Sequence, residues 1–343
     1  MRYIVFALLL FLLTVVIVIP WSMISSLQRG GQNSPRQKPS SPQEDVYFPQ
    51  NPTITVFRSR EGEIADLTLE EYVVGVVAAE MPAEFHPEAL KAQAILARTY
   101  AVSKIREFGG SGSSVTDRAD ISDNPDYDQA WLSDEEMRAR WGFFSYWRYR
   151  QKIEEAVSAT EGVVATYNKR LIEAVYHSTS GGQTEHAEEV WGSHYPYLVS
   201  VDSPHEKHSP YISTAHRFTW EQLGDRLDIS AAFLASTHES PEQSVVSVAQ
   251  ETRTGRIGKA IIGNKEFSAV QLRQLLGLPS TWWEVSHDSS GVTFTVRGFG
   301  HGVGLSQYGA DGLAKQGENH QKIMQHFYPG IELIPQNEVQ TNP

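Results

Sequence analysis

The residues best suited to chemistry lie in three stretches, and the first contains a lone glutamate. Glu80 closes the apolar run Val73–Ala79 (VVGVVAA). Apolar surroundings disfavour a carboxylate, so burial there would raise the pKa of Glu80 and keep it protonated near neutral pH, as a general acid requires. A solvated glutamate at a helix end is the alternative reading. Lys91 and Arg98, seven residues apart, share one helical face, which could be a salt-bridged surface or a cleft lining.

Two further stretches combine hydroxyls, histidines and glycines. Tyr176–Glu185 (YHSTSGGQTE) suits close approach to a hydroxylated ligand, although a turn without function fits it equally well. Gly298–Ala310 (GFGHGVGLSQYGA) has five glycines in thirteen residues, which predicts tight backbone packing before a helix that starts at Ser306. The side chains in these stretches that could contact a polar ligand are His177, Ser178, Ser180, His301, Ser306, Gln307 and Tyr308.

Several other chemistries are excluded or disfavoured. The chain has no cysteine, which excludes disulfides, thiol nucleophiles and thiolate metal sites. The glycine-rich stretch lacks both a βαβ frame and the P-loop lysine, GLSQYG is not a nucleophile elbow, and the 12 histidines match no zinc signature. We therefore expect no cofactor and no metal ion, with a histidine-and-carboxylate site as the remaining alternative. The net charge of -12 argues against nucleic acid as a partner.

The N-terminus predicts a membrane anchor. No charged residue lies between Arg2 and Arg29, and a helix over Tyr3–Ile24 would be roughly 33 Å long, enough to span the hydrocarbon layer. Arg2 favours a cytoplasmic N-terminus. A cleaved signal peptide is the rival interpretation, but no small-x-small site follows the apolar run cleanly. We assign residues 1–24 to a transmembrane helix and 25–52, rich in Gln, Ser, Pro and Gly, to a flexible linker.

The rest of the chain mixes helices and short strands without regular βαβ alternation, which predicts an α+β domain over 53–335 with a substrate groove. A second lobe is expected at about 210–290, and 336–343 form a tail. Capping boxes at Thr68 and Ser133 and a proline at position 87 mark helix starts. The expected helices are 68–80, 87–107, 152–159, 220–227, 269–275, 306–315 and 320–327, and the expected strands are 54–57, 163–167, 171–176, 244–251, 259–262 and 292–296.

At these three stretches the chain resembles the stage II sporulation protein D family, whose domain also occurs in amidase-enhancer proteins. EYVVGVVAAEMP with ALKAQAILARTY is similar to the family's leading motif, YHSTSGGQTE with the following VWG to its central motif, and GHGVGLSQYGA to its closing motif. Their order and spacing match from about Ile54 to Ile334.

The resemblance implies a lytic transglycosylase that cleaves the bond between N-acetylmuramic acid and N-acetylglucosamine in glycan strands stripped of stem peptides, leaving 1,6-anhydro ends. The family's catalytic glutamate falls on Glu80, and the resemblance points to Lys91 and Arg98 as cleft residues, with His177, Ser178 and Tyr308 on the substrate side. One carboxyl group suffices, because the sugar's own C6 hydroxyl replaces the water that a hydrolase must activate. The alternatives are a non-catalytic peptidoglycan-binding or amidase-enhancer module and a metallohydrolase.

The resemblance also implies partners and a location. Sporulation members act during engulfment in a membrane complex with stage II sporulation proteins P and M, and protein P removes the stem peptides. The catalytic domain is then expected between the mother-cell and forespore membranes. Some members bind zinc through cysteines and a histidine in the segment that corresponds to Asp120–Trp131. Here that segment reads DISDNPDYDQAW, without either residue type, so we expect no structural zinc.

Overall fold

Residue 49 and residues 51–239 and 245–340 are described by the structure, a computed structural model of the 343-residue chain. They belong to one unit, Val46–Pro343. The anchor predicted over residues 1–24 and nearly all of the predicted linker lie outside these described residues. Among the helices that the described residues form, none has the length and apolar content needed to cross a membrane.

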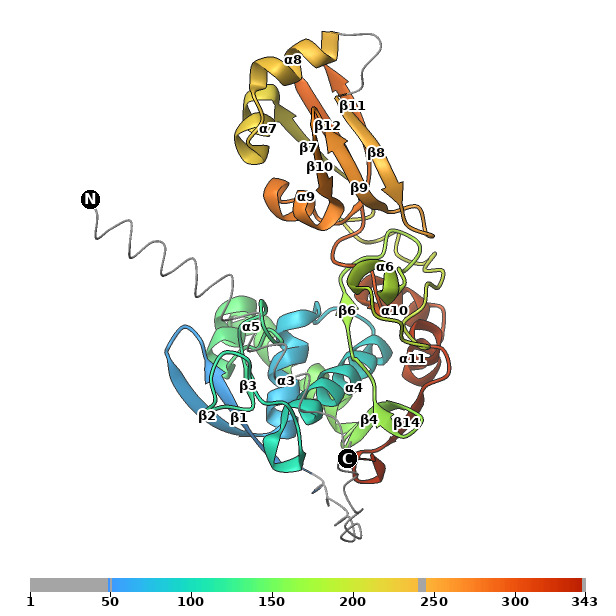
Figure 1. The fold of residues 1–343 in the computed structure, drawn as a ribbon. Helices are drawn as coiled ribbons and strands as arrows, with labels where there is room; N and C mark the ends of the chain where they lie inside the picture. The colour runs from blue at the N-terminus through green and yellow to red at the C-terminus, as the bar shows by residue number, and fades with distance from the viewer. Residues whose placement is uncertain (1–48, 50, 240–244, 341–343) are drawn as a thin grey trace, which may run out of the picture. The chain divides into compact units, whose positions relative to one another are not determined.

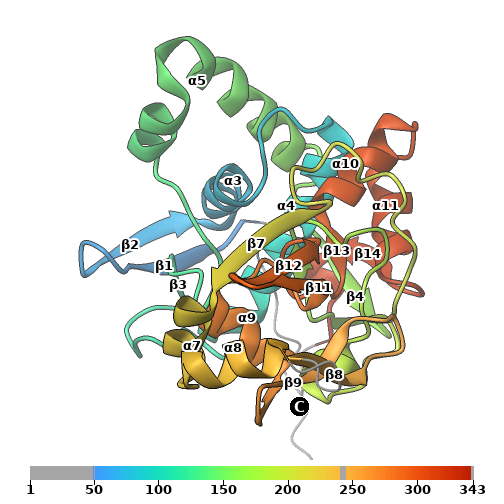
Figure 2. The same cartoon turned by 90° about the horizontal axis from the view of Figure 1, so that it is seen from above.

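Three helices meet in the first hydrophobic core: α3 (Leu69–Glu80), α4 (Pro87–Lys104) and α5 (Asp134–Ser158). Figures 1 and 2 both show them side by side. The predicted capping box at Thr68 is confirmed, and the backbone turns extended at Met81, which ends α3 at Glu80. Pro87 opens α4 as predicted, but α4 ends at Lys104, before the predicted end at 107, and a short 3-10 turn follows.

Helix α5 is longer than the sequence indicated. The predicted capping box at Ser133 is present, and the helix continues through residues that we had left unassigned. Gly142, at φ 68° and ψ 170°, interrupts the helical backbone in the middle. Glycine adopts this positive φ without steric cost, so the two halves of α5 can change direction there.

Five groups of strands complete the α+β class, which is confirmed. In the first core, β1 (Thr53–Arg58) pairs antiparallel with β2 (Glu63–Thr68) and parallel with β3 (Ile121–Ser122). A second sheet has the order β14-β4-β5, with β4 at Val163–Tyr167, β5 at Arg170–Leu171 and β14 at Glu332–Pro335. Helices α6 (Ala187–Trp191), α10 (Gln307–Lys315) and α11 (His320–Phe327) flank this core.

The predicted strand over 171–176 is wrong. Only its ends lie in strands, in β5 and in β6 (Tyr176–His177). Between them the backbone bonds to side chains: Glu173 N–H donates to the Tyr197 hydroxyl, and the Tyr328 hydroxyl donates to the Val175 carbonyl. A hydrophobic pattern cannot distinguish such a segment from a strand, because its buried backbone groups are equally satisfied.

A second hydrophobic core is built from residues between Phe218 and Val296. Its two antiparallel sheets have the orders β11-β12-β7 and β10-β9-β8. Strands β8, β9 and β12 and helices α7 and α9 were predicted, whereas β7, β10, β11 and α8 were missed. The elements are β7 (Thr214–Thr219), α7 (Trp220–Leu227), α8 (Ala231–Glu239), β8 (Val246–Glu251), β9 (Ile257–Ile262), β10 (Lys265–Ser268), α9 (Ala269–Leu276), β11 (Trp282–Asp288) and β12 (Gly291–Arg297).

One short pairing matters most for the site. Strand β6 pairs in parallel with β13 (Leu305–Ser306), so that Tyr176 lies opposite Leu305 and His177 opposite Ser306. This pairing joins the central and closing stretches of the sequence, which are more than a hundred residues apart. The loop before β13 is held as well, since Thr179 and Phe299 form an isolated bridge.

Candidate active site

Glu80 lies at the C-terminal end of α3 with its carboxyl group largely withdrawn from water. Its Oε1 accepts a hydrogen bond from the Ala130 N–H at 3.0 Å, and the Tyr176 hydroxyl bonds to the same carboxyl group. Burial raises the pKa of Glu80; the two hydrogen bonds and the charge of Arg140 act in the opposite direction without cancelling it. The carboxyl group therefore holds its proton at higher pH than a solvated glutamate does.

A chain of hydrogen bonds leads to this carboxyl group. The Tyr72 hydroxyl donates to Gln129 Oε1 at 3.4 Å, and Gln129 Nε2 donates to the Tyr176 hydroxyl oxygen at 3.0 Å. With its oxygen occupied as an acceptor, Tyr176 is left to donate its own proton to Glu80. Burial holds the pKa of Tyr176 well above its usual range, so the phenol remains a donor at every physiological pH.

The segment that contains Ala130 packs closely against α3 because position 75 of the helix is a glycine. A Cβ atom on Gly75 would lie 2.1 Å from Trp131 Nε1, so only glycine lets the tryptophan approach the helix. Leu132 N–H also donates to the Gly75 carbonyl at 3.2 Å. These contacts at Gly75 place the Ala130 N–H beside Glu80, which lies further along α3.

Three of the four carboxylates of the segment Asp120–Trp131 are engaged within the protein, whereas Asp126 is exposed. Asp120 accepts from the Thr55 hydroxyl at 2.8 Å, Asp123 pairs with Arg58 at 3.0 Å, and Asp128 accepts from the Tyr100 hydroxyl at 2.8 Å. Within the parts of the chain that the structure describes, no three His, Asp or Glu side chains gather as metal ligands would. The absence of structural zinc stays a prediction.

Glu80 opens onto a cavity of about 910 Å³, which combines residues from all three stretches. Helix α3 contributes Glu80, and β6 with its neighbours contributes the central stretch. The loop before β13 and the start of α10 contribute the closing stretch. The expected residues that line it are Glu80, His177, Ser178, His301, Gln307 and Tyr308; its other polar or aromatic side chains include Tyr100, Gln129, Arg140, Tyr176, Tyr211, Arg273 and Phe299.

Two histidines in this cavity are neutral. The Nδ1 of His177 lies 3.1 Å from the Val303 carbonyl oxygen, and burial lowers the pKa of His177 well below its usual range. A neutral ring that donates from Nδ1 carries a lone pair on Nε2, and that atom is buried without a hydrogen-bond partner among the described residues. Burial also lowers the pKa of His301 to about 4. His177 therefore carries an unprotonated acceptor nitrogen in the cavity wall, covered by neighbouring atoms.

An aromatic wall lies on another side of the cavity. The rings of Tyr211 and Phe299 are stacked at 4.6 Å with an angle of 21° between them, and Phe299 is 40% exposed. Tyr308 packs edge-on against Phe85 at 4.9 Å. Flat apolar faces beside polar groups suit a ligand that has both, as a sugar ring does.

Four of the expected residues are not among the described residues that line this cavity. Arg98 is fully buried and pairs with Glu70 at 2.6 Å, while Lys91 pairs with Glu88 at 2.6 Å. The cleft position implied for Lys91 and Arg98 is therefore incorrect in this structure. Ser180 donates to Glu206, and Ser306 accepts from the Gly309 N–H as the cap of α10.

Sequence reasoning missed several residues around Glu80. Tyr176 stood in the central stretch, and its place just before His177 at a strand end was the one available signal. Gln129 and Ala130 lie in a segment that the sequence predicted to be irregular. The functional group of Ala130 is its backbone N–H, and because every residue except proline has one, the residue type gives no signal for it. Arg140 sits in the unassigned part of α5, where it donates to the Ala78 carbonyl at 3.0 Å.

Comparisons with known proteins show what the chain is similar to. The family model described as "Stage II sporulation protein" matches residues 58–167, which include Glu80 and Ala130. Stage II sporulation protein D of Bacillus subtilis is 38% identical over 300 residues, covering 86% of this chain and 83% of the relative. The protein of the same name in Bacillus amyloliquefaciens is 36% identical, covering 82% and 78%. An "Amidase enhancer" of Bacillus subtilis is 28% identical, covering 76% of this chain and 40% of the relative. The chain therefore belongs to the stage II sporulation protein D family.

Proposed function

We propose that this protein is a lytic transglycosylase that acts on denuded peptidoglycan strands during sporulation, with Glu80 as its only acid and base. The observation that carries the proposal is the half-buried Glu80, whose carboxyl pKa is raised by burial, at the wall of a cavity large enough for sugars. No cation pairs with this carboxyl group within 4.0 Å among the described residues, so desolvation dominates its ionisation. Its relatives named as sporulation proteins support the cell-wall context.

The reaction needs one proton to travel out and one to return. Protonated Glu80 donates to the glycosidic oxygen, the bond from that oxygen to C1 of the muramic acid breaks, and N-acetylglucosamine leaves with a free hydroxyl group. The C6 hydroxyl of the same muramic acid then bonds to C1 and gives its proton to the Glu80 carboxylate. The product is a 1,6-anhydro end, no water is consumed, and the carboxyl group is restored.

The hydrogen bonds to Glu80 stabilise its ionised form during the reaction. Between the two proton transfers Glu80 is a carboxylate, and the Ala130 N–H and the Tyr176 hydroxyl stabilise that charge. Burial thus raises the pKa of Glu80, and the two hydrogen bonds limit the rise, so that the group can still lose its proton during the reaction. The balance between these effects lets one group act as donor and then as acceptor.

The remaining residues of the cavity bind the sugars. Ser178, Gln307 and Tyr308 offer hydrogen bonds to the sugar hydroxyl groups. The Tyr211–Phe299 stack contacts an apolar ring face. Asp126 and Asp128 also line the cavity. The carboxylate of Asp128 already accepts from Tyr100 and from the Ser122 N–H, whereas Asp126 is exposed, so the products of the reaction decide whether a second carboxylate activates water.

The cellular setting is part of the same proposal. Residues 1–24 anchor the protein in a membrane, residues 25–52 are the linker, and the catalytic domain faces the space between mother cell and forespore. The partners are stage II sporulation proteins P and M, and protein P supplies strands without stem peptides. Protease added before engulfment is complete, to wall-stripped sporangia with intact membranes, should remove the catalytic domain while sparing the first residues; digestion of the N-terminus first would contradict this orientation.

Mass spectrometry of the products tests the reaction itself. Full-length protein in detergent, mixed with denuded glycan strands, should release fragments that end in 1,6-anhydro-muramic acid. Reducing ends, each heavier by one water, would instead indicate a hydrolase. Intact strands would favour the second candidate, a non-catalytic module, which the similarity to an amidase enhancer supports. Loss of activity with a chelator would indicate a metallohydrolase.

A further inference from the structure

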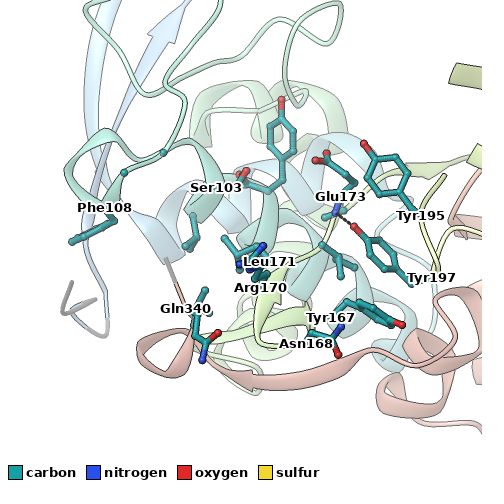
Figure 3. A pocket seen from close by; sticks show the side chains of 17 residues that line it. Ser103, Phe108, Tyr167, Asn168, Arg170, Leu171, Glu173, Tyr195, Tyr197 and Gln340 are labelled. Carbon is teal, nitrogen blue, oxygen red and sulfur yellow. Dashed lines mark hydrogen bonds between the residues drawn. The ribbon is translucent and has the colours of Figure 1, made fainter. Parts of the chain in front are cut away.

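A second cavity adjoins the one that contains Glu80. It has a volume of about 700 Å³ and lies between the C-terminal half of α4 and the segment that links β4 to β6 (Figure 3). Tyr100 and Ala174 line both cavities, so the two share a boundary. Tyr100 is held at this boundary by its hydroxyl, which donates to Asp128 Oδ1 at 2.8 Å. We call this second space the tyrosine cavity.

Three tyrosines form one side of it. The ring centroids of Tyr167 and Tyr197 are 5.3 Å apart, and those of Tyr195 and Tyr197 are 5.8 Å apart. Figure 3 shows these rings together, with Phe108 on the opposite side. The Tyr197 hydroxyl accepts from the Glu173 N–H at 3.1 Å, which fixes its ring. Aromatic rings fixed in this way offer flat apolar surface at low entropic cost.

The rim of the tyrosine cavity is polar and carries both signs of charge. Asn168 and Arg170 lie at the β4–β5 turn, and both are exposed, as is Glu173. Asn168 and Lys169 have φ values of 51° and 62°, the two positive angles of a tight hairpin turn, so the position of the rim is set by the turn. One arginine against one glutamate does not select for a charged ligand. Amide, hydroxyl and carboxylate groups beside aromatic rings suit a neutral, hydroxylated ring.

We propose that the tyrosine cavity is a second saccharide-binding site, in which a glycan strand that starts at Glu80 continues past Tyr100 and Ala174 to stack on Tyr195. The identity of the ligand rests on the proposed function. The strand is held at two places, and only one of them performs chemistry. Binding then strengthens with strand length, because a short saccharide reaches only the cavity of Glu80.

Calorimetric titration of the full-length Glu80→Gln protein tests this, because the variant should not consume its ligand. The probes are a disaccharide and an octasaccharide prepared from denuded glycan. Adding Tyr195→Ala should weaken octasaccharide binding about tenfold and leave disaccharide binding unchanged. Asn168→Gly, which removes the amide group while glycine keeps the positive φ of the turn, should weaken octasaccharide binding in the same selective way. Phe144→Ala, which removes a side chain that is 95% exposed and lines neither cavity, is the matched control.

Two results would overturn the second site. Octasaccharide affinity could be unaffected by both Tyr195→Ala and Asn168→Gly, or it could fall together with disaccharide affinity. The proposed function fails separately, if the wild-type protein leaves denuded strands intact. In that case selective loss of octasaccharide binding would still identify the tyrosine cavity as a saccharide site, so the two failures can be told apart.

Discussion

Helix α3 carries a glutamate at each end, and the two have opposite surroundings. Glu70, in the first turn, accepts from Arg98 through both carboxylate oxygens, at 2.7 Å from Nε and 2.6 Å from a terminal nitrogen. Arg98 in turn donates to the carbonyls of Val157 and Val163, so the pair joins α3, α4, α5 and β4. Glu80, in the last turn, has burial as the largest influence on its pKa.

The difference follows from position as much as from neighbours. The positive N-terminal end of the helix dipole favours a carboxylate at Glu70, and the negative C-terminal end disfavours one at Glu80. A paired carboxylate stabilises the fold, whereas a desolvated one can hold and release a proton. The same residue type on the same helix is therefore structural at one end and chemically active at the other.

Substitution of Glu80 should produce the largest change. Glu80→Gln keeps the size of the side chain but cannot exchange a proton, so release of anhydro-ended products should fall on the order of ten-thousandfold. The rate is measured by mass spectrometry of products over time. Glu84→Gln, at an exposed glutamate outside the cavity, should retain the wild-type rate. Comparable rates for both variants would remove Glu80 from the mechanism.

Breaking the other end of the helix should affect stability instead. Arg98→Ala leaves Glu70 without its partner beside a buried gap, which should lower the free energy of unfolding by roughly 3 to 5 kcal/mol. Urea denaturation measures the loss. Lys91→Ala, at a half-exposed pair with Glu88, should cost less than about 1 kcal/mol. If Arg98→Ala remained as stable as Lys91→Ala, the structural role of the Glu70–Arg98 pair would be refuted.

A smaller effect should come from Tyr176. Tyr176→Phe removes the hydroxyl that stabilises ionised Glu80, so the rate should fall about tenfold. The same hydroxyl lowers the pKa of Glu80, so its loss raises that pKa further. Activity that requires protonated Glu80 should then persist to higher pH in the variant, as a pH–rate profile would reveal. A limb that moved to lower pH would show that Tyr176 does not donate to this carboxyl group; Tyr127→Phe, at an exposed tyrosine, is the control.

The smallest effect is a change in stability with pH, caused by burial of the Glu80 carboxylate. Because its pKa is raised in the folded state, folding takes up a proton there, and the resulting stability is lost as pH rises through the folded pKa. Glu80→Gln has no charge to bury and should become more stable than the wild type by about 1 kcal/mol at pH 8, but not at pH 4. Thermal melting at both pH values measures this. A stability difference that does not vary with pH would contradict burial as the cause.

The helices that carry Glu70, Glu80 and Arg98 could be predicted from the sequence better than the contacts of these side chains. Local signals sufficed for α3 and for the start of α4, because capping boxes and a first-turn proline act within a few residues. The end of α3 at Glu80 was also predicted. The partner of Arg98 was not, because Glu70 is 28 residues away and helical spacing cannot tell a buried face from a cleft.

The contacts around Glu80 depend on pairings that no local pattern encodes. The Ala130 N–H reaches Glu80 only because Gly75 admits Trp131, and the central and closing stretches meet only through the two-residue pairing of β6 with β13. The three stretches could be identified from residue types, and six of the ten expected residues line the cavity. The sequence did not predict the tyrosine cavity. Its tyrosines are far from Phe108 in the chain, and each fits the pattern of an ordinary core residue.

The central claim concerns the proton on Glu80, and a ¹³C NMR titration of glutamate carboxyl groups measures it directly. The Glu80 resonance is assigned by its absence from the spectrum of Glu80→Gln. We expect this carboxyl group to titrate clearly above the ordinary glutamate value of 4.5, and the activity of the wild type to fall as the group ionises. A midpoint at or below 4.5, or full activity with Glu80 ionised, would contradict the role of Glu80 as the acid.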